Sequence, residues 1–132
     1  MTSSDMAMVR DVIRRQSRFV LTTHVNPDGD GLGSELALRA GLLQLGKSVT
    51  IVNHSPTPDH YQWLDPSGVI AQYAPDTHAP VIAAADAVLI LDTNQPDRLR
   101  SMEEPVRNSR AQKVVIDHHL DPHAFAVLYY ID

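Results

Sequence analysis

Short runs of apolar and β-branched residues alternate along the chain with longer segments whose apolar residues recur at helical spacing. Five of these runs predict strands, at 19–23, 49–52, 87–91, 113–116 and 126–131. The run at 87–91 contains no polar residue, which is typical of a strand that is buried on both faces of a sheet. The chain is therefore expected to contain a sheet with a well-covered centre.

Three helices are expected, at 3–16, 33–45 and about 98–108. In the middle one, Leu36, Ala40 and Leu43 lie on one apolar stripe, which is expected to face the core. Gly46 follows at the position where glycine commonly ends a helix.

The stretch 53–80 is rich in proline and has no clean period, so it predicts loops, with a short helical turn near 60–64 and a small strand at 69–73. Elsewhere the order is strand, helix, strand, and then again strand, helix, strand. This alternation predicts an α/β fold, a parallel β-sheet with helices on both faces.

Composition narrows the function classes. Hydrophobic residues make up 43% of the 132 residues, enough for the core of one domain, and the formal net charge is −5. A negative charge argues against a surface that grips nucleic acid everywhere. With no cysteine, a thiolate metal site and a cysteine nucleophile are excluded.

The sequence shows neither a signal peptide nor a membrane-spanning run, so a soluble, cytoplasmic protein with no membrane partner is expected.

Acidic and imidazole side chains gather where predicted strands end, at 24–34, 92–94 and 117–119. In parallel sheets, ligands bind at the carboxyl ends of the strands. One such cluster is explained by turn and capping preferences alone. Three clusters, two of them with histidine, indicate a metal site. Oxygen and imidazole ligands together suit manganese, and also iron, cobalt or zinc.

Two other site types compete for the first cluster. Asn26, Asp28, Asp30 and Gly31 match four positions of a calcium-binding EF-hand loop, but the final position needs Glu and holds Ala37. A haloacid-dehalogenase-type phosphatase also uses an Asp pair at a strand end. That fold needs its first Asp directly after the strand, which is not the position of Asp28. It also leaves the cluster at 117–119 without a role.

The three clusters together resemble the DHH phosphoesterase superfamily. Asp117, His118 and His119 after a strand resemble its naming motif, and the segment 24–34 resembles its first motif. The form of that segment is similar to the branch of bifunctional oligoribonuclease and phosphoadenosine-phosphate phosphatase enzymes. Leu91 and Asp92 resemble the start of the second motif.

The resemblance implies two divalent metal ions, most readily Mn²⁺, with Mg²⁺, Co²⁺ or Fe²⁺ as alternatives. His24 and Asp28 would hold the first ion, Asp30 and His118 the second, and Asp92 would bridge both. Such a pair activates a water molecule for attack on phosphorus.

Two further residues have implied roles beside the ions. His119 would contact the scissile phosphate or orient a ligand, and Asp117 would fix a histidine tautomer. The family also has a fourth motif and a carboxyl-terminal substrate domain beyond the last motif found here. Residues 1–132 are therefore expected to be the amino-terminal part of a DHH domain, truncated, and weak or inactive by itself.

The expected substrates are a small nucleotide or a short single-stranded RNA, and a homodimer formed partly through regions outside this chain is a further expectation. Cyclic dinucleotides and inorganic polyphosphate remain alternative substrates. A non-catalytic regulatory or interaction fragment of the same fold is the alternative outside enzymology.

Several conspicuous residues are expected to be structural. The histidines His54, His60, His78 and His123 are scattered through predicted loops, where solvent exposure is the usual state. Trp63 is interpreted as a packing anchor rather than as a platform for nucleobases.

Overall fold

The computed structural model describes residues 3–93, 96–118 and 125–130, and it forms one six-stranded sheet. The strand order is β3-β2-β1-β4-β5-β6, where the strands are β1 (Arg18–Thr23), β2 (Ser48–Asn53), β3 (Ile70–Gln72), β4 (Ala87–Leu91), β5 (Gln112–His118) and β6 (Phe125–Tyr130). Strands β1 to β5 are parallel, which confirms the predicted fold class.

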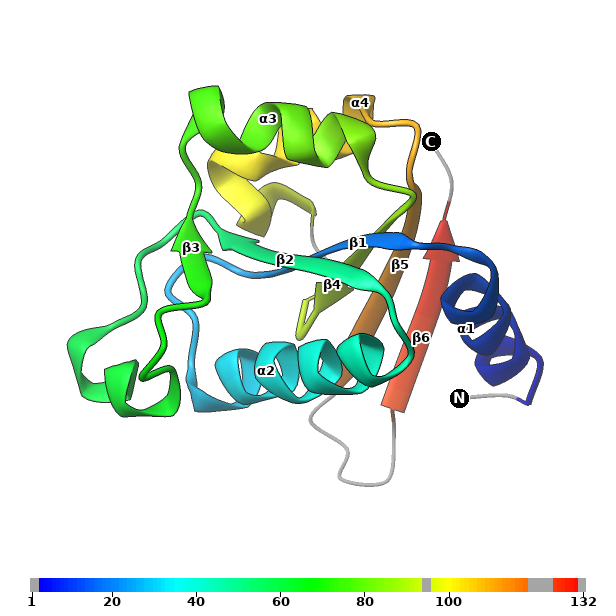
Figure 1. Ribbon diagram of the computed structural model, residues 1–132, viewed down its shortest axis with the longest axis horizontal. Helices are drawn as coiled ribbons and strands as arrows, with labels where there is room; N and C mark the ends of the chain where they lie inside the picture. The colour runs from blue at the N-terminus through cyan, green and yellow to red at the C-terminus, as the bar shows by residue number, and fades with distance from the viewer. Residues whose placement is uncertain (1–2, 94–95, 119–124, 131–132) are drawn as a thin grey trace.

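Helices cover both faces of the sheet (Figure 1). One layer holds α1 (Ser3–Arg15) and α2 (Gly29–Gln44), and the other holds α3 (Pro75–Ala84) and α4 (Glu103–Asn108). Alternate residues of each strand face opposite layers. Thus Phe19 packs in one core and Val20 in the other.

The last strand differs from the rest because β6 runs antiparallel to β5. A parallel pairing needs a crossover of a dozen or more residues, and the segment 119–124 is too short for one. Strand β5 also extends two residues beyond the predicted 113–116, so that Asp117 and His118 belong to the strand itself.

Helix α2 begins at Gly29, four residues earlier than predicted. The cause is Asp28, whose Oδ1 accepts a hydrogen bond from the backbone N–H of Gly31 at 2.9 Å and so caps the helix. At the other end Gly46 has φ +78°, the conformation expected for glycine after a helix. The predicted stripe is mostly wrong: Ala40 and Leu43 are exposed, Leu36 is partly buried, and the buried residues are Gly31, Leu32, Glu35 and Leu42.

Three further segments refine the sequence prediction. Helix α3 was not predicted, since Pro75 and Pro80 resemble loop residues; Pro75 occupies the first turn, where no backbone donor is needed. The helix expected at 98–108 is instead two segments, η2 (Pro96–Met102) and α4, and η2 itself is kinked at Arg100, which has φ +53°.

The 3-10 helix η1 (Asp59–Leu64) occupies the place of the predicted short turn. Its Trp63 side chain is exposed, so the interpretation of this residue as a packing anchor is wrong. None of the helices described above combines the length and the apolar content needed to cross a lipid bilayer.

Candidate metal centre

The strand order reverses between β1 and β4, and this is where the first two site residues meet. His24 directly follows β1 and Asp92 directly follows β4. The two strands pair in parallel up to Thr23 and Leu91, so their carboxyl ends lie side by side. His24 Nε2 consequently lies 3.3 Å from Asp92 Oδ2. In α/β sheets, a crevice for ligands opens at such a reversal of strand order.

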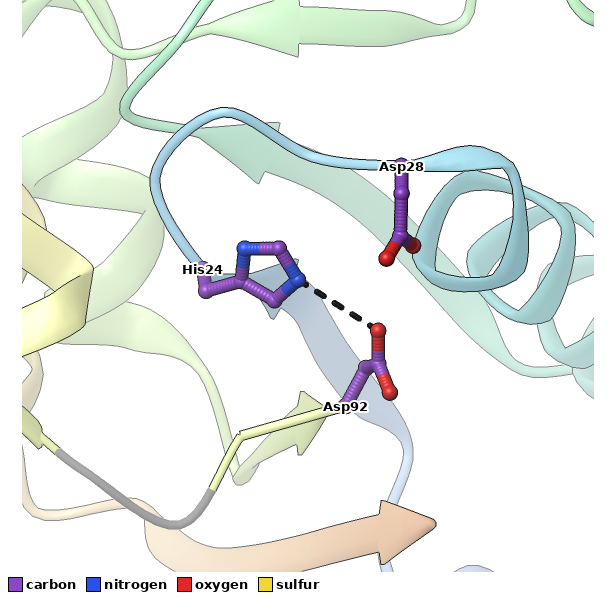
Figure 2. Close-up of side chains that lie close together, drawn as sticks. All are labelled: His24, Asp28 and Asp92. Atoms are coloured by element: carbon purple, nitrogen blue, oxygen red, sulfur yellow. Dashed lines mark hydrogen bonds and ion pairs between the residues drawn. The ribbon is translucent and has the colours of Figure 1, made fainter. Parts of the chain in front are cut away.

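Asp28 completes a group of three side chains (Figure 2). One potential ligand atom from each of His24, Asp28 and Asp92 lies within 4.8 Å of the others. Asp28 reaches this position because it caps α2, which starts beside the two strand ends. The group therefore combines one imidazole nitrogen with two carboxylates, a donor set that suits a divalent transition metal ion.

The loop after β1 is held by contacts to two other parts of the chain. The backbone N–H of Val25 donates to the carbonyl of Arg98 at 2.8 Å, and that of Asn26 donates to Ser55 Oγ at 3.0 Å. Asn26 adopts a left-handed conformation with φ +52°, which asparagine tolerates better than most residues. These contacts fix the path that carries His24 and Asp28 to one place.

The neighbours of His24 define which of its nitrogens can bind a cation. Nδ1 lies 2.7 Å from the carbonyl oxygen of Val25, an atom that only accepts, so Nδ1 is assigned the proton. Nε2, on the other side of the ring, faces Asp92 Oδ2 and is the nitrogen available to a cation. The guanidinium of Arg98 lies against the same ring, with Nη2 3.3 Å from Nδ1, and places a positive charge at the rim of the group.

The pKa of Asp92 reflects the position of this residue in the site. Burial raises the pKa of Asp92 above its usual range, the negative charge of Asp28 raises it further, and the hydrogen bond to His24 opposes both effects. Two carboxylates that face one another repel in the absence of a cation. The residues present therefore fit a divalent metal ion, which would relieve this repulsion.

Gly31 provides the space for such a group. A Cβ atom at this position would lie 2.9 Å from Thr23 Oγ1, 3.5 Å from Asp28 Oδ1 and 3.6 Å from Asp92 Oδ2. The Thr23 hydroxyl is fixed because it donates to the carbonyl of Leu91 at 2.7 Å. Glycine at position 31 is thus required by its close approach to the Thr23 hydroxyl, beside the two carboxylates, rather than by backbone conformation.

Comparisons with known proteins identify the family of this site. The model of the DHH family, N-terminal domain, matches residues 18–132. This chain belongs to the DHH family. Its group of three residues is consistent with a metal site typical of this family.

A solved structure of an exopolyphosphatase-related protein from Bacteroides fragilis is similar to this DHH domain over 92% of the chain, with 31% sequence identity and a TM-score of 0.84. The match covers 36% of that protein, so the chain spans about a third of the length of this relative. A search of curated proteins finds no match.

The other predicted DHH site residues do not join this group among the described side chains. Asp30 lies in the first turn of α2, exposed, because the cap at Asp28 makes this segment helical instead of extended. Asp117 and His118 are the last two residues of β5. They follow Ile116, which pairs with Leu91, so the backbone at the end of β5 lies beside Asp92. Their side chains, and the whole of His119, lie outside the described residues.

A buried polar network behind the DHH motifs was not predicted. The Asn53 side chain accepts from the backbone N–H of Thr23 at 3.1 Å and donates to Glu35 Oε1 at 2.9 Å. Burial raises the pKa of Glu35 to about 8, with the hydrogen bond from Asn53 acting in the opposite direction. Glu35 therefore lies in the core as a protonated acid at neutral pH, joining α2 to the strand that carries His24.

Proposed function

We propose that this DHH domain forms part of a metal-dependent enzyme that hydrolyses phosphate esters of short oligoribonucleotides, of 3′-phosphoadenosine 5′-phosphate, or of both. The observation that carries the proposal is the convergence of His24, Asp28 and Asp92 at the reversal of strand order. Three potential ligands from two loops, 68 positions apart in sequence, meet where the fold places its ligands.

The residues divide the work in the following way. His24 Nε2, Asp28 and Asp92 would hold the first ion, with the proton on Nδ1 keeping Nε2 free for it. In the proposal, Asp30 and His118 hold a second ion that shares Asp92. When bound, such a pair supplies an activated water and stabilises charge on the phosphate oxygens.

The domain's own charge supports a small substrate. With a net charge of −5, the chain has little to attract a long nucleic acid, whereas metal ions would reverse the field locally. Arg98 adds a cationic group beside His24, where a phosphate oxygen would lie. The form of the segment 24–34, which resembles the oligoribonuclease and nucleotide-phosphatase branch, favours nucleotide substrates.

Hydrolysis of inorganic polyphosphate is the second candidate. The structural relative is described as exopolyphosphatase-related, and it matches nearly the whole of this chain. Polyphosphate needs no recognition of a base or a ribose, so the same metal group would serve both reactions.

A substrate panel separates the two candidates. The protein is incubated with Mn²⁺ and, separately, with a diadenylate, 3′-phosphoadenosine 5′-phosphate and tripolyphosphate, and the products are followed by chromatography. We expect adenosine monophosphate from the first two substrates and much slower turnover of the third. Turnover of tripolyphosphate alone would contradict the nucleotide proposal.

Two variants, one at each end of β4, provide a test and its control. Asp92→Asn removes a charge at the carboxyl end of β4 and is expected to lower hydrolysis at least about 100-fold. Asp86→Asn removes a charge just before the amino end of the same strand, where the carboxylate accepts from the backbone N–H groups of Ser17 and Arg18. The second variant is expected to keep the activity of the unmodified protein.

A further inference from the structure

The indole of Trp63 forms a flat apolar surface that the core does not use. Trp63 is 73% exposed. The other exposed large hydrophobic residues of the described chain, Met8, Leu43 and Leu45, are less exposed. Exposure of so large an aromatic side chain is unfavourable in water, since it leaves apolar area unburied. A partner that covers the ring would recover that free energy.

The ring is held in one orientation by its own helical turn. Trp63 Nε1 donates to the carbonyl of His60 at 2.9 Å, so the only polar atom of the indole is already satisfied. What remains for a ligand is the face of the ring, which suits stacking rather than hydrogen bonding. A fixed ring also loses less conformational entropy when a ligand covers it.

Helix η1 is anchored beside the metal centre through Tyr61. A Cβ atom built on Gly29 would lie 3.3 Å from Cε1 of Tyr61, so this ring packs on the first residue of α2, next to Asp28. Two peptide links separate Tyr61 from Trp63, so their Cα atoms are at most about 7.6 Å apart. Figure 1 shows the same relationship, with the turn between β2 and β3 lying next to the start of α2.

His60 adds a second ring to this turn. Its ring centroid lies 4.2 Å from that of Tyr61, with the planes tilted by 42°. The three aromatic residues of η1 are therefore linked to one another, His60 with Tyr61 by ring contact and Trp63 with the carbonyl of His60. Tyr61 joins this aromatic turn to the start of α2, next to Asp28.

We propose that Trp63 stacks on a nucleobase of the substrate whose phosphate is held at His24, Asp28 and Asp92. The inference rests on the proposed nucleotide hydrolysis and adds the base-binding subsite to it. Stacking on an aromatic ring requires no charge and accepts any base, which suits an acidic chain that acts on short oligonucleotides of varied sequence. Inorganic polyphosphate has no base and would gain nothing from this surface.

Intrinsic fluorescence tests the subsite directly, because Trp63 is the one tryptophan in the sequence. The protein is titrated in Mg²⁺ with adenosine 5′-monophosphate and, separately, with ribose 5-phosphate, which carries the same phosphate without the base. Excitation at the red edge of the tryptophan band avoids absorption by adenine. Saturable quenching by the nucleotide, and none by the sugar phosphate, is expected. Equal responses to the two compounds would overturn the proposal.

Kinetics with variants give the second readout. Trp63→Leu is expected to raise KM for a diadenylate about five- to 100-fold with little change in kcat, and Trp63→Phe is expected to restore most of the loss. Neither variant should affect any turnover of tripolyphosphate. Leu45→Ala, which truncates another exposed apolar side chain just beyond the far end of α2, is the matched control and should leave KM unchanged.

The failure of this inference differs from failure of the proposed function. Hydrolysis of nucleotides together with an unchanged KM in Trp63→Leu would remove the stacking subsite and leave the function in place. Quenching by the nucleotide without any nucleotide hydrolysis would support the subsite and contradict the function.

Discussion

The imidazole of His24 and the carboxylate of Asp92 lie 3.3 Å apart, Nε2 to Oδ2, at the ends of two neighbouring parallel strands. Asp92 holds this position in a left-handed conformation with φ +63°. Such a conformation is uncommon outside glycine, and residues that adopt it are concentrated at functional sites. Asp28 lies beside this pair, so two carboxylates are brought close together, and this has consequences for stability.

Without metal, Asp92→Asn is expected to unfold at a higher urea concentration than the unmodified protein at neutral pH. Because the folded-state pKa of Asp92 is raised, its contribution to stability is present below the ordinary aspartate pKa and is lost as the pH rises through the raised value. The variant avoids this loss. Urea unfolding in the presence of a chelator measures the difference, which should vanish in strong acid.

Manganese is expected to reverse that order. At a free concentration 100 times its dissociation constant, the ion would stabilise the unmodified protein by about 2.7 kcal/mol and Asp92→Asn by far less. Thermal unfolding with and without Mn²⁺ measures both. Asp86→Asn should behave in the opposite way: backbone hydrogen bonds lower the pKa of Asp86, so this variant should be destabilised without metal yet keep the response to manganese. Parallel responses of Asp92→Asn and the unmodified protein would contradict the assignment.

Metal binding should also weaken in acid. Protons compete with the ion for Asp92, and the raised pKa of this carboxyl brings the competition to a higher pH than for an ordinary aspartate. Calorimetric titration with Mn²⁺ at a series of pH values should show affinity falling, and proton release growing, as the pH decreases toward that pKa. An affinity independent of pH over this range would rule out Asp92 as a ligand.

Substitutions of two glycines in α2 test the need for space at the site separately from the effect of helix propensity. Gly31→Ala would place a methyl group 2.9 Å from Thr23 Oγ1 and close to both carboxylates, so we expect a loss of about 1–3 kcal/mol and weaker metal binding. Gly33→Ala meets no atom within 4 Å and should stabilise the helix by about 0.5–1 kcal/mol. Chemical denaturation of both variants, with and without Mn²⁺, is the measurement. Equal metal affinities would show that Gly31 has no role at the site.

Glu35 should make stability depend on pH in a defined window. Its pKa rises from 4.5 to about 8 on folding, so the unmodified protein should lose stability as the pH rises from 4.5 to about 8, by an amount on the order of a few kcal/mol. Glu35→Gln keeps an acceptor for Asn53 and should lack this loss. Urea unfolding across the window, with Glu104→Gln at an exposed position as control, gives the comparison. Parallel pH profiles for the unmodified protein and Glu35→Gln would contradict a buried neutral acid.

Sequence alone predicted the part of the site that depends on sheet geometry. His24 and Asp92 each follow a strand of a parallel sheet, and the carboxyl ends of such strands share one edge, so their meeting required no knowledge of side-chain contacts. The position of Asp30 was harder to predict. Treating 24–31 as an extended loop overlooked the cap at Asp28, which starts the helix at Gly29 and places Asp30 in its first turn.

Other features had no local signal. The partner of Glu35 is Asn53, 18 positions away, and a charged residue among apolar helix positions is normally expected to be exposed. The exposure of Trp63 was likewise hidden, since aromatic residues are usually buried and it is the neighbouring Tyr61 that packs on Gly29. Both features depend on distant contacts rather than on the periodicity of their own segments.

Asp28 serves two purposes that no other standard amino acid combines. The start of α2 requires a short side chain ending in an oxygen acceptor, which serine, threonine and asparagine also offer. The place beside His24 and Asp92 requires a negative charge, which glutamate also offers, with a side chain one methylene longer. Only aspartate meets both requirements, so a substitution at position 28 that keeps the helix cap would still remove the charge from the group of three.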